Sequence, residues 1–313
     1  MTRSIEVHDA ALWVHHMRQG DFAAAWRVSD AILNSHASSP GSFSPRHLRP
    51  VWRGSPLAGK RVLVRCHHGL GDTFQFIRYA PLIKSIAQEV IVGPQPSLAP
   101  LMLRVPGVDR VAPLDEGDAE TAYDVDVEVM ELPYIFRSTP SNIPSQTPYI
   151  HVEPAGFVDN GRLAVGLVWK AGDWDSRRSV PVSLLEPLME IAGISVHILQ
   201  RGPGLQERPD GFGILSGSED VLESAQIIRA LDLVLTVDTM LAHLAGALGI
   251  PVWLMLQADA DWRWMERRKD SPWYPGMRLF RQEVEGDWTS VITGIVHELR
   301  RSTSRRPAGR KKG

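Results

Sequence analysis

The sequence predicts an α/β protein in which two Rossmann-like domains follow a short helical segment. Apolar, β-branched runs alternate with helical segments in two stretches of the chain, a rhythm typical of parallel sheets covered by helices. The two stretches are separated by residues 138–160, which are dense in Pro, Ser and Asn. A length of 313 residues is enough for two ordinary domains.

Composition narrows the class of protein. Hydrophobic residues make up 43% of the chain and charged residues 22%, and the net charge of -2 gives no basic field for nucleic acid. The single cysteine, Cys66, excludes an intrachain disulfide and a cysteine-cluster metal site. No stretch has the roughly 20 apolar residues of a membrane span, and the first residues lack the apolar core of a signal peptide. We expect a cytoplasmic protein with no transmembrane segment.

The first elements are helical. Apolar residues in 5–36 recur at spacings of three and four, and Gly20-Asp21 divides the run into two short helices. The segment GDFAAAW resembles half of a tetratricopeptide repeat; one such pair is too short for a solenoid and should pack on the main body. Residues 37–50, rich in Ser and Pro, are expected to be a linker.

The first Rossmann-like stretch begins with a buried strand, KRVLVRC, and a turn, HHGLGD. Helices are expected at 73–88 and 96–105, with Pro81 weakening the first of them. The strands are expected at 60–66, 89–93, 109–114 and 123–129.

The second stretch repeats the pattern and ends in an amphipathic helix at 287–300, with Asp287 available as its N-cap. The residues from Ser302 to Gly313 are basic and polar, so we expect a solvated tail; the alternative is weak contact with an anionic membrane surface. Strands are expected at 163–169, 195–200, 232–237 and 251–256, and helices at 183–192, 219–230 and 239–248.

Open parallel sheets bind ligands at the carboxyl ends of their strands, so residues that follow strands are the candidates for chemistry. After the first strand comes Gly69-Leu70-Gly71-Asp72-Thr73, where two glycines allow a tight turn. Asp72 at a helix start should stay ionised and could accept a proton from a hydroxyl group; the alternative is an ordinary helix cap. His67 and His68 beside it are either bases or hydrogen-bond partners, or are simply exposed.

Three further loops follow strands of the second stretch. Residues 169–179 contain Lys170, Arg177 and Arg178, and Arg suits phosphate binding; the alternative is a solvated loop. Asp238-Thr239 begins a helix whose free N–H groups suit a pyrophosphate, and His243 lies one turn later; the alternative is a capped helix with a core histidine. Arg201 begins the remaining loop, RGPG.

Several familiar signatures are absent from the sequence. Neither half contains the G-x-G-x-x-G dinucleotide signature, which argues against hydride transfer, and there is no Walker P-loop, H-E-x-x-H or G-x-S-x-G motif. The residues alone therefore indicate two nucleotide-fold halves with an anion site in the second.

These motifs resemble those of the lipopolysaccharide heptosyltransferases, which belong to glycosyltransferase family 9. They are more similar still to the bacterial branch in which such a domain follows tetratricopeptide repeats. Matches are scattered over about residues 43–300. They lie in FSPRHLRPVWRGSPLAGKRVLV, GLGDTFQFIRYAPLI, VGLVWKAGDWDSRRSVPVSLLEPL, LQRGPG, ALDLVLTVDTMLAHLAGALGIPVWLML and DWRWMERRKDSPWYPGMRLFRQ.

The resemblance implies a GT-B architecture, in which two Rossmann-like domains face each other across a cleft. It implies a nucleotide-sugar donor bound mainly by the C-terminal domain, an acceptor bound mainly by the N-terminal domain, inversion by direct displacement, and no metal or cofactor. The expected divisions are a helical extension with linker at 1–45, an acceptor domain at 46–157, a donor domain at 158–286, a helix crossing back at 287–301 and a disordered basic tail at 302–313.

The resemblance also implies roles for single residues. Asp72 would be the catalytic base. The donor would be bound by Lys170, Arg178, Ser179, Arg201, Asp238, Thr239 and His243, and the acceptor side would be formed by His67, His68, Gly69, Gly71 and Gln75.

This chain departs from the branch at three points. His67-His68 stand where the branch often has Glu-Gln, and Lys170 stands where it often has a small residue. The repeat array is reduced to a stub. No role follows from the sequence for the aromatic cluster of Trp262, Trp264, Trp273 and Tyr274.

The expected function is transfer of a heptose or hexose from a nucleotide sugar to a hydroxyl group on a glycan, a lipid-linked glycan or a protein. The expected location is the cytoplasm, with peripheral contact at the inner face of the membrane as an addition. Two alternatives stay open, a sugar-nucleotide epimerase and a non-catalytic module that binds nucleotide sugars.

Overall fold

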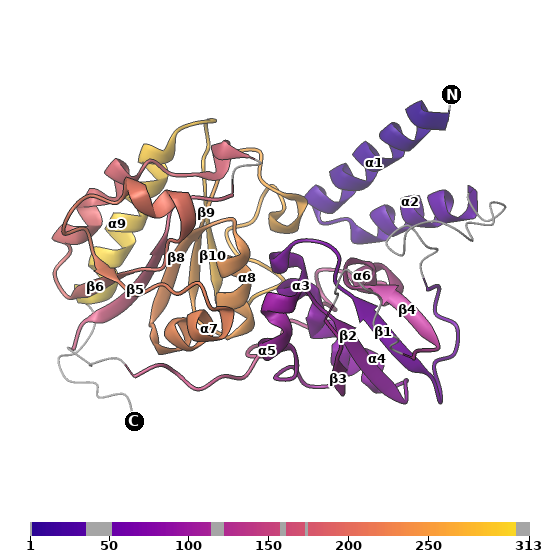
Figure 1. Cartoon of the computed structure of the whole chain (residues 1–313). Coiled ribbons are helices and arrows are strands. Elements are labelled where there is room, and N and C mark those ends of the chain that lie inside the picture. Colours follow the sequence, from indigo (N-terminus) through magenta and orange to yellow (C-terminus); the bar gives the residue numbers. More distant parts are fainter. Residues whose placement is uncertain (1, 36–51, 114–121, 157–160, 173–174, 305–313) are drawn as a thin grey trace. The chain divides into compact units, whose positions relative to one another are not determined.

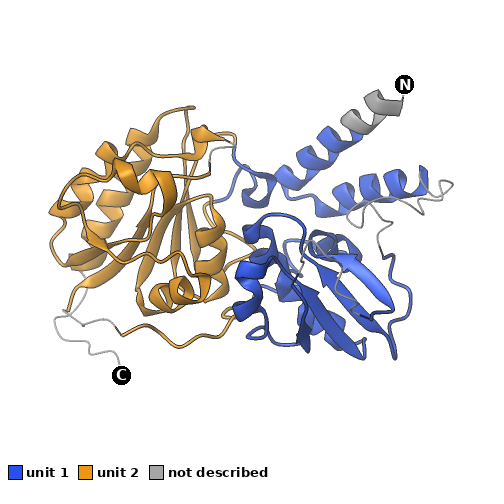
Figure 2. Cartoon of the chain, in the orientation of Figure 1, with its two compact units in different colours: residues 1–146, 260–268 blue, residues 147–259, 269–313 orange. Residues whose placement is uncertain are grey.

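The computed structural model describes residues 2–35, 52–113, 122–156, 161–172 and 175–304 (Figure 1). The predicted linker at 37–50 and the tail beyond Ser304 lie outside these residues. The chain divides into two compact units (Figure 2), of which the first contains residues 1–146 and 260–268 and the second contains the remainder. Within the described ranges, none of the helices is both long and apolar enough to cross a membrane.

The first unit is built on a four-stranded parallel sheet, as the sequence predicts. Its strand order is β3-β2-β1-β4, and Val62 of the central strand β1 pairs with Val90 of β2 and Val125 of β4. The interior residues of β1 are buried on both sides because helices cover the sheet. The strands are β1 (Arg61–Arg65), β2 (Glu89–Gly93), β3 (Arg110–Val111) and β4 (Val125–Glu128).

The helices of this unit are shorter than predicted. The single helix expected at 73–88 is three pieces, α3 (Leu70–Phe76), η2 (Ile77–Tyr79) and α4 (Ala80–Lys84). Pro81 lies in the first turn of α4, where a missing N–H costs nothing, so the chain restarts a helix there. The other short helices are η3 (Pro96–Leu98), α5 (Ala99–Met102), η4 (Val129–Glu131) and α6 (Leu132–Ile135).

The N-terminal helices α1 (Thr2–Gln19) and α2 (Phe22–Ser35) form the predicted pair and belong to the first unit. Gly20 ends α1 in the left-handed conformation, with φ of 79°, which glycine adopts without steric cost. The buried Trp26 of α2 donates a hydrogen bond of 2.6 Å from Nε1 to the carbonyl oxygen of Ser138. The pair therefore packs on the main body of its unit, as expected.

The second unit has a six-stranded parallel sheet in the order β10-β9-β8-β5-β6-β7. Four of the strands match predictions, whereas β7 and β10 were not predicted. The strands are β5 (Leu163–Val168), β6 (Ile194–Ile198), β7 (Ile214–Leu215), β8 (Leu233–Val237), β9 (Val252–Leu256) and β10 (Met277–Arg281).

The helices of the second unit include three of the expected α-helices and one that is altered. The segment expected at 183–192 is a 3₁₀ helix with Pro187 inside it, because proline removes a helical hydrogen bond. The elements are η5 (Ser176–Arg178), η6 (Val182–Glu190), η7 (Gly202–Glu207), α7 (Val221–Ala230), α8 (Met240–Ala247) and α9 (Trp288–Ser304).

The last helix differs from its predicted place. Asp287 accepts a hydrogen bond of 3.1 Å from the backbone N–H of Ser290, so it caps α9 as expected. The buried face of α9, however, packs in the core of the second unit with β5 and β6, rather than crossing back. The segment that returns to the first unit is instead residues 260–268, which contain η8 (Trp262–Trp264). Ser302–Ser304, predicted to be part of the tail, belong to α9.

Candidate functional site

The predicted acceptor-side residues lie in the turn that follows β1 and in α3. The helix α3 begins at Leu70, three residues earlier than predicted, with Gly69 as its N-cap. Gly71 and Asp72 therefore belong to the first helical turn. Asp72 Oδ2 accepts a hydrogen bond of 2.9 Å from the backbone N–H of Gly69, which satisfies one of the donors that a helix start leaves open.

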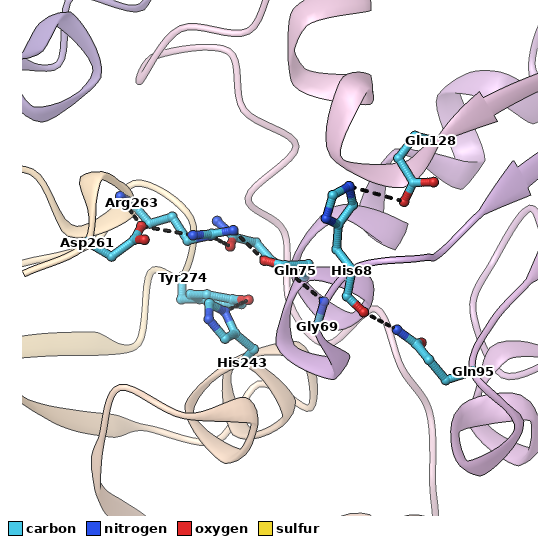
Figure 3. Close-up of polar contacts among 10 residues, drawn as sticks. His68, Gly69, Gln75, Gln95, Glu128, His243, Asp261, Arg263 and Tyr274 are labelled. Carbon is cyan, nitrogen blue, oxygen red and sulfur yellow. Dashed lines mark hydrogen bonds and ion pairs between the residues drawn. The ribbon is translucent and has the colours of Figure 1, made fainter. Parts of the chain in front are cut away.

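The other oxygen of Asp72 forms an ion pair that the sequence did not predict. Asp72 Oδ1 contacts Nη2 of Arg263, and both side chains are largely buried, with exposed fractions of 21% and 11%. Arg263 also donates 2.8 Å from Nε to Gln75 Oε1 and 2.9 Å from Nη1 to Asp261 Oδ1 (Figure 3). The guanidinium lies over the ring of Trp262 at 4.8 Å. Asp72 is thus held in a fixed orientation by Arg263 and the Gly69 N–H.

A second carboxylate at this edge was also missed. Glu128 ends β4, the strand beside β1, and its side chain is only 7% exposed. Its Oε1 accepts 3.1 Å from the backbone N–H of His67 and lies 4.0 Å from Nε2 of His68. Burial raises the pKa of Glu128 to about 7, against the lowering effect of the His67 N–H and of Arg65. No sequence signal singled it out, because β4 reads VDVE and an acidic residue at a strand end is ordinary until its burial is known.

Residues predicted to bind the donor gather at the carboxyl ends of β5 and β6 in the second unit. The backbone N–H groups of Trp169 and Lys170 donate to Gln200 Oε1 at 3.1 and 2.9 Å. The hydroxyl of Ser179 accepts 3.1 Å from the N–H of Ala171. These hydrogen bonds fix Lys170 and Ser179 in the loop that follows β5. The ammonium group of Lys170 forms an ion pair with Glu207.

The start of α8 brings two more predicted residues together. Arg178 donates 2.8 Å from Nη1 to the carbonyl oxygen of Asp238. Thr239, the next residue, is the N-cap of α8, and its side chain makes no capping hydrogen bond. The Arg178 guanidinium thus lies beside a helix N-terminus, where N–H groups and a cation favour the same anion.

Two predicted donor residues have other partners. His243 is buried, and its Nδ1 lies 3.0 Å from the hydroxyl of Tyr274 (Figure 3), as expected for the alternative of a satisfied core histidine. Arg201 forms an ion pair of 2.8 Å with Glu219. The aromatic cluster is divided: Trp262 belongs to the first unit and Tyr274 to the second.

No family model matches the chain. Protein FlbA of Caulobacter vibrioides is 25% identical over 324 residues, which cover 90% of this chain and 53% of FlbA. The chain therefore spans about half the length of the curated relative it matches.

Solved structures resemble the chain in fold. A glycosyl transferase family 9 protein from Veillonella parvula has a TM-score of 0.59 at 11% identity, covering 80% of this chain and 99% of that one. The ADP-heptose lps heptosyltransferase II of E. coli has a TM-score of 0.56 at 14% identity, covering 78% and 99%. The iron-containing dodecameric glycosyltransferase TibC of enterotoxigenic E. coli has a TM-score of 0.57 at 15% identity, covering 79% and 78%. The chain has the fold of the family 9 glycosyltransferases.

Within this family 9 fold, each unit presents different chemistry at the carboxyl edge of its parallel sheet. The first unit presents two carboxyl groups and an imidazole, those of Asp72, Glu128 and His68. The second unit presents cations and N–H donors, with Arg178 beside the start of α8. The predicted α/β architecture with two parallel-sheet halves and an N-terminal helix pair is confirmed.

Proposed function

We propose that the chain transfers a sugar of heptose or hexose type from a nucleotide sugar to a hydroxyl group of an acceptor. The observation that carries this proposal is the hydrogen bond from Arg178 to the Asp238 carbonyl at the start of α8. It sets a guanidinium beside open helical N–H groups, an arrangement suited to a diphosphate. Two proteins of the same fold support the class of donor, since one is named for ADP-heptose and TibC has been solved with ADP-D-beta-D-heptose.

The second unit is the proposed donor side. Arg178 would bind the diphosphate, with Lys170 and Ser179 on the same loop. Asp238, Thr239 and His243 would together hold the ribose and the diphosphate. Arg201 would lie toward the nucleoside. Because Arg and N–H groups would supply the positive charge, the proposed reaction needs no metal ion.

The first unit is the proposed acceptor side, formed by His67, His68, Gly69, Gly71 and Gln75. In an inverting displacement, the acceptor oxygen attacks the anomeric carbon while the bond to the diphosphate breaks, and a base takes the hydroxyl proton. Asp72 is the base that the sequence indicates. Its carboxylate has about four lone-pair sites, so its contacts with Arg263 and Gly69 leave it able to accept another hydrogen bond.

A second candidate function is a module that binds a nucleotide sugar without transferring it. The observation that favours it is the contact of both Asp72 oxygens with donors of the same unit, which ties the expected base into a structural ion pair.

The experiment that tests the proposal measures release of nucleoside diphosphate from ADP-heptose and from ADP-, UDP- and GDP-hexoses, with EDTA present. We expect release from one class of donor by the wild-type chain and loss of release in Arg178→Ala. Binding of a donor with no release under any condition would instead identify the non-catalytic module.

A further inference from the structure

Glu128 is a buried acid for which the expected mechanism has no use. It ends β4, directly beside the end of β1, from which the His67-His68 turn leaves. Oε1 faces the backbone N–H of His67 and the ring of His68, while Oε2 is buried without a hydrogen-bond partner in the described part of the chain. A buried carboxylate that is only partly satisfied is costly, so a structural role alone explains it poorly.

His68 connects this buried acid to the surface. Its side chain is 49% exposed, and Nε2 lies 4.0 Å from Glu128 Oε1, with the imidazole directed toward Glu128 (Figure 3). The carbonyl oxygen of His68 accepts a hydrogen bond from Gln95 Nε2, which fixes the backbone from which the ring projects. At 4.0 Å this contact is longer than a hydrogen bond, but a proton gained by the imidazole would form an ion pair with Glu128, and Nδ1 is the ring nitrogen left to meet an acceptor.

The groups around Glu128 keep both of its charge states accessible. Burial and the nearby Glu131 raise its pKa, whereas the His67 N–H, the Val129 N–H and Arg65 lower it, and the result is about 7. The buried thiol of Cys66 lies close enough for Glu128 to raise its pKa as well. Near neutral pH, Glu128 can therefore respond to a change of charge on its neighbour.

Asp72 is in a different situation, because its two oxygens already contact Arg263 and the Gly69 N–H. An acceptor hydroxyl would therefore have to share Asp72 with these two donors. Proton uptake by His68 would create an ion pair with Glu128.

We propose that His68 takes the proton from the acceptor hydroxyl and that Glu128 is the residue that positions it. This inference rests on the proposed function and assigns one step of it. The acceptor O–H bond breaks and its electron pair forms the bond to the anomeric carbon. The bond from that carbon to the diphosphate oxygen breaks, and the leaving group keeps that electron pair. The proton goes to Nδ1 of His68, while Nε2–H faces Glu128, and Asp72 stays ionised beside Arg263.

The pairing is tested first without any substrate, by following the titration of Glu128 in the full chain labelled with ¹³C-glutamate, its signal identified by its loss in Glu128→Gln. We expect the Glu128 midpoint to rise by about half a unit or more in His68→Gln, because the imidazole that favours the ionised acid is gone. His67→Gln is the matched control, since its contact with Glu128 is through the backbone N–H and is kept. An unchanged midpoint in His68→Gln would overturn the proposal.

The role in turnover is tested with the donor that the wild type uses. His68→Gln should lower turnover by about 100-fold or more while leaving donor affinity unchanged, the usual loss for a proton-transfer group. Glu128→Gln should lower turnover and flatten its pH profile. The double variant should be no slower than His68→Gln, because Glu128 acts through His68. Exposed His151→Gln serves as the control.

Wild-type turnover in His68→Gln, or a double variant in which the two losses multiply, would overturn the proposal. An absence of release from every donor by the wild type, together with a coupled titration, would contradict the proposed function and leave the pairing of His68 with Glu128 standing.

Discussion

At the scale of residues, Arg178 gives the sharpest test of the donor side. Arg178→Ala should weaken binding of the preferred nucleoside diphosphate by about 1.5–3 kcal/mol, the usual contribution of a hydrogen bond to a charged group. Isothermal titration calorimetry measures this loss. Arg177→Ala is the matched control, because Arg177 is exposed and pairs with Asp175 at 2.9 Å. Equal losses in the two variants would show that the adjacent cations act only through net charge.

Asp72 belongs to the other unit, and its replacement should affect turnover rather than donor affinity. Asp72→Asn removes the charge that pairs with Arg263, so turnover should fall while donor affinity stays within error of the wild type. Calorimetry with the same nucleotide and a release assay separate the two effects. A loss of donor affinity as large as that of Arg178→Ala would contradict the division of labour between the units.

The raised pKa of Glu128 predicts that the free energy of unfolding depends on pH. Its pKa is about 7 in the folded chain, against an ordinary value of 4.5, so the folded state holds more protons than the unfolded state between these pH values. Its contribution to stability is therefore fully present below pH 4.5 and is lost as the pH rises through 7, by on the order of 3 kcal/mol. Urea unfolding of the wild type and Glu128→Gln at pH 5 and pH 8 measures this. Parallel pH dependence of the two chains would contradict it.

Single residues could be proposed from the sequence where they follow strands, but not where they pair over long distances. Asp72 and Arg178 became candidates because the carboxyl end of a parallel strand is the expected place for a ligand. Arg263 was missed because its partner Asp72 is 191 residues away in the chain, and no sequence pattern relates the two positions. Glu128 was missed because one acidic residue at the end of an apolar strand carries no signature until burial is known.

At the scale of elements, long periodic segments were predicted and weakly patterned ones were not. The strand β5 was evident from its apolar run, whereas β7 has only two residues, Ile214 and Leu215, both exposed. Helix starts were misjudged where glycine and proline are involved, as at α3, which begins before Gly71. The amphipathic pattern of α9 could not predict which unit the helix packs against. An apolar face indicates that a helix is covered, but it does not identify the sheet that covers it.

The contact of α8 with Tyr274 gives a prediction for a helix. A Cβ atom built on Gly246 would lie 2.4 Å from the ring of Tyr274, so Gly246 is what lets this ring approach and hydrogen-bond His243. Gly246→Ala should lower the free energy of unfolding by about 1–3 kcal/mol through overpacking. In the matched control, Gly294→Ala in α9, the added Cβ meets no atom within 4 Å and should stabilise the helix by up to about 1 kcal/mol. Denaturant unfolding that ranks the two variants the other way would contradict this.

In the whole molecule, the chain consists of two parallel-sheet units that carry different side chains at the carboxyl ends of their strands. The first unit is not contiguous in sequence, because residues 260–268 return to it and supply Arg263 to Asp72. Asp72, Glu128 and His68 lie in that unit, whereas Arg178 lies beside the start of α8 in the other. The proposed transfer would use this separation, since activating an acceptor hydroxyl and holding a diphosphate call for opposite charges.

Binding of a nucleotide sugar by the second unit is tested by a thermal-shift titration of the wild-type chain and Arg178→Ala. The ligands are ADP, UDP, GDP, CMP and dTDP and their common sugars, in the presence of EDTA. We expect one nucleotide to raise the melting temperature of the wild type, because a ligand that binds only the native state stabilises it. We expect a much smaller rise in Arg178→Ala. No rise with any nucleotide at millimolar concentration, or the same rise in both chains, would contradict the claim that the second unit holds a nucleotide sugar at the start of α8.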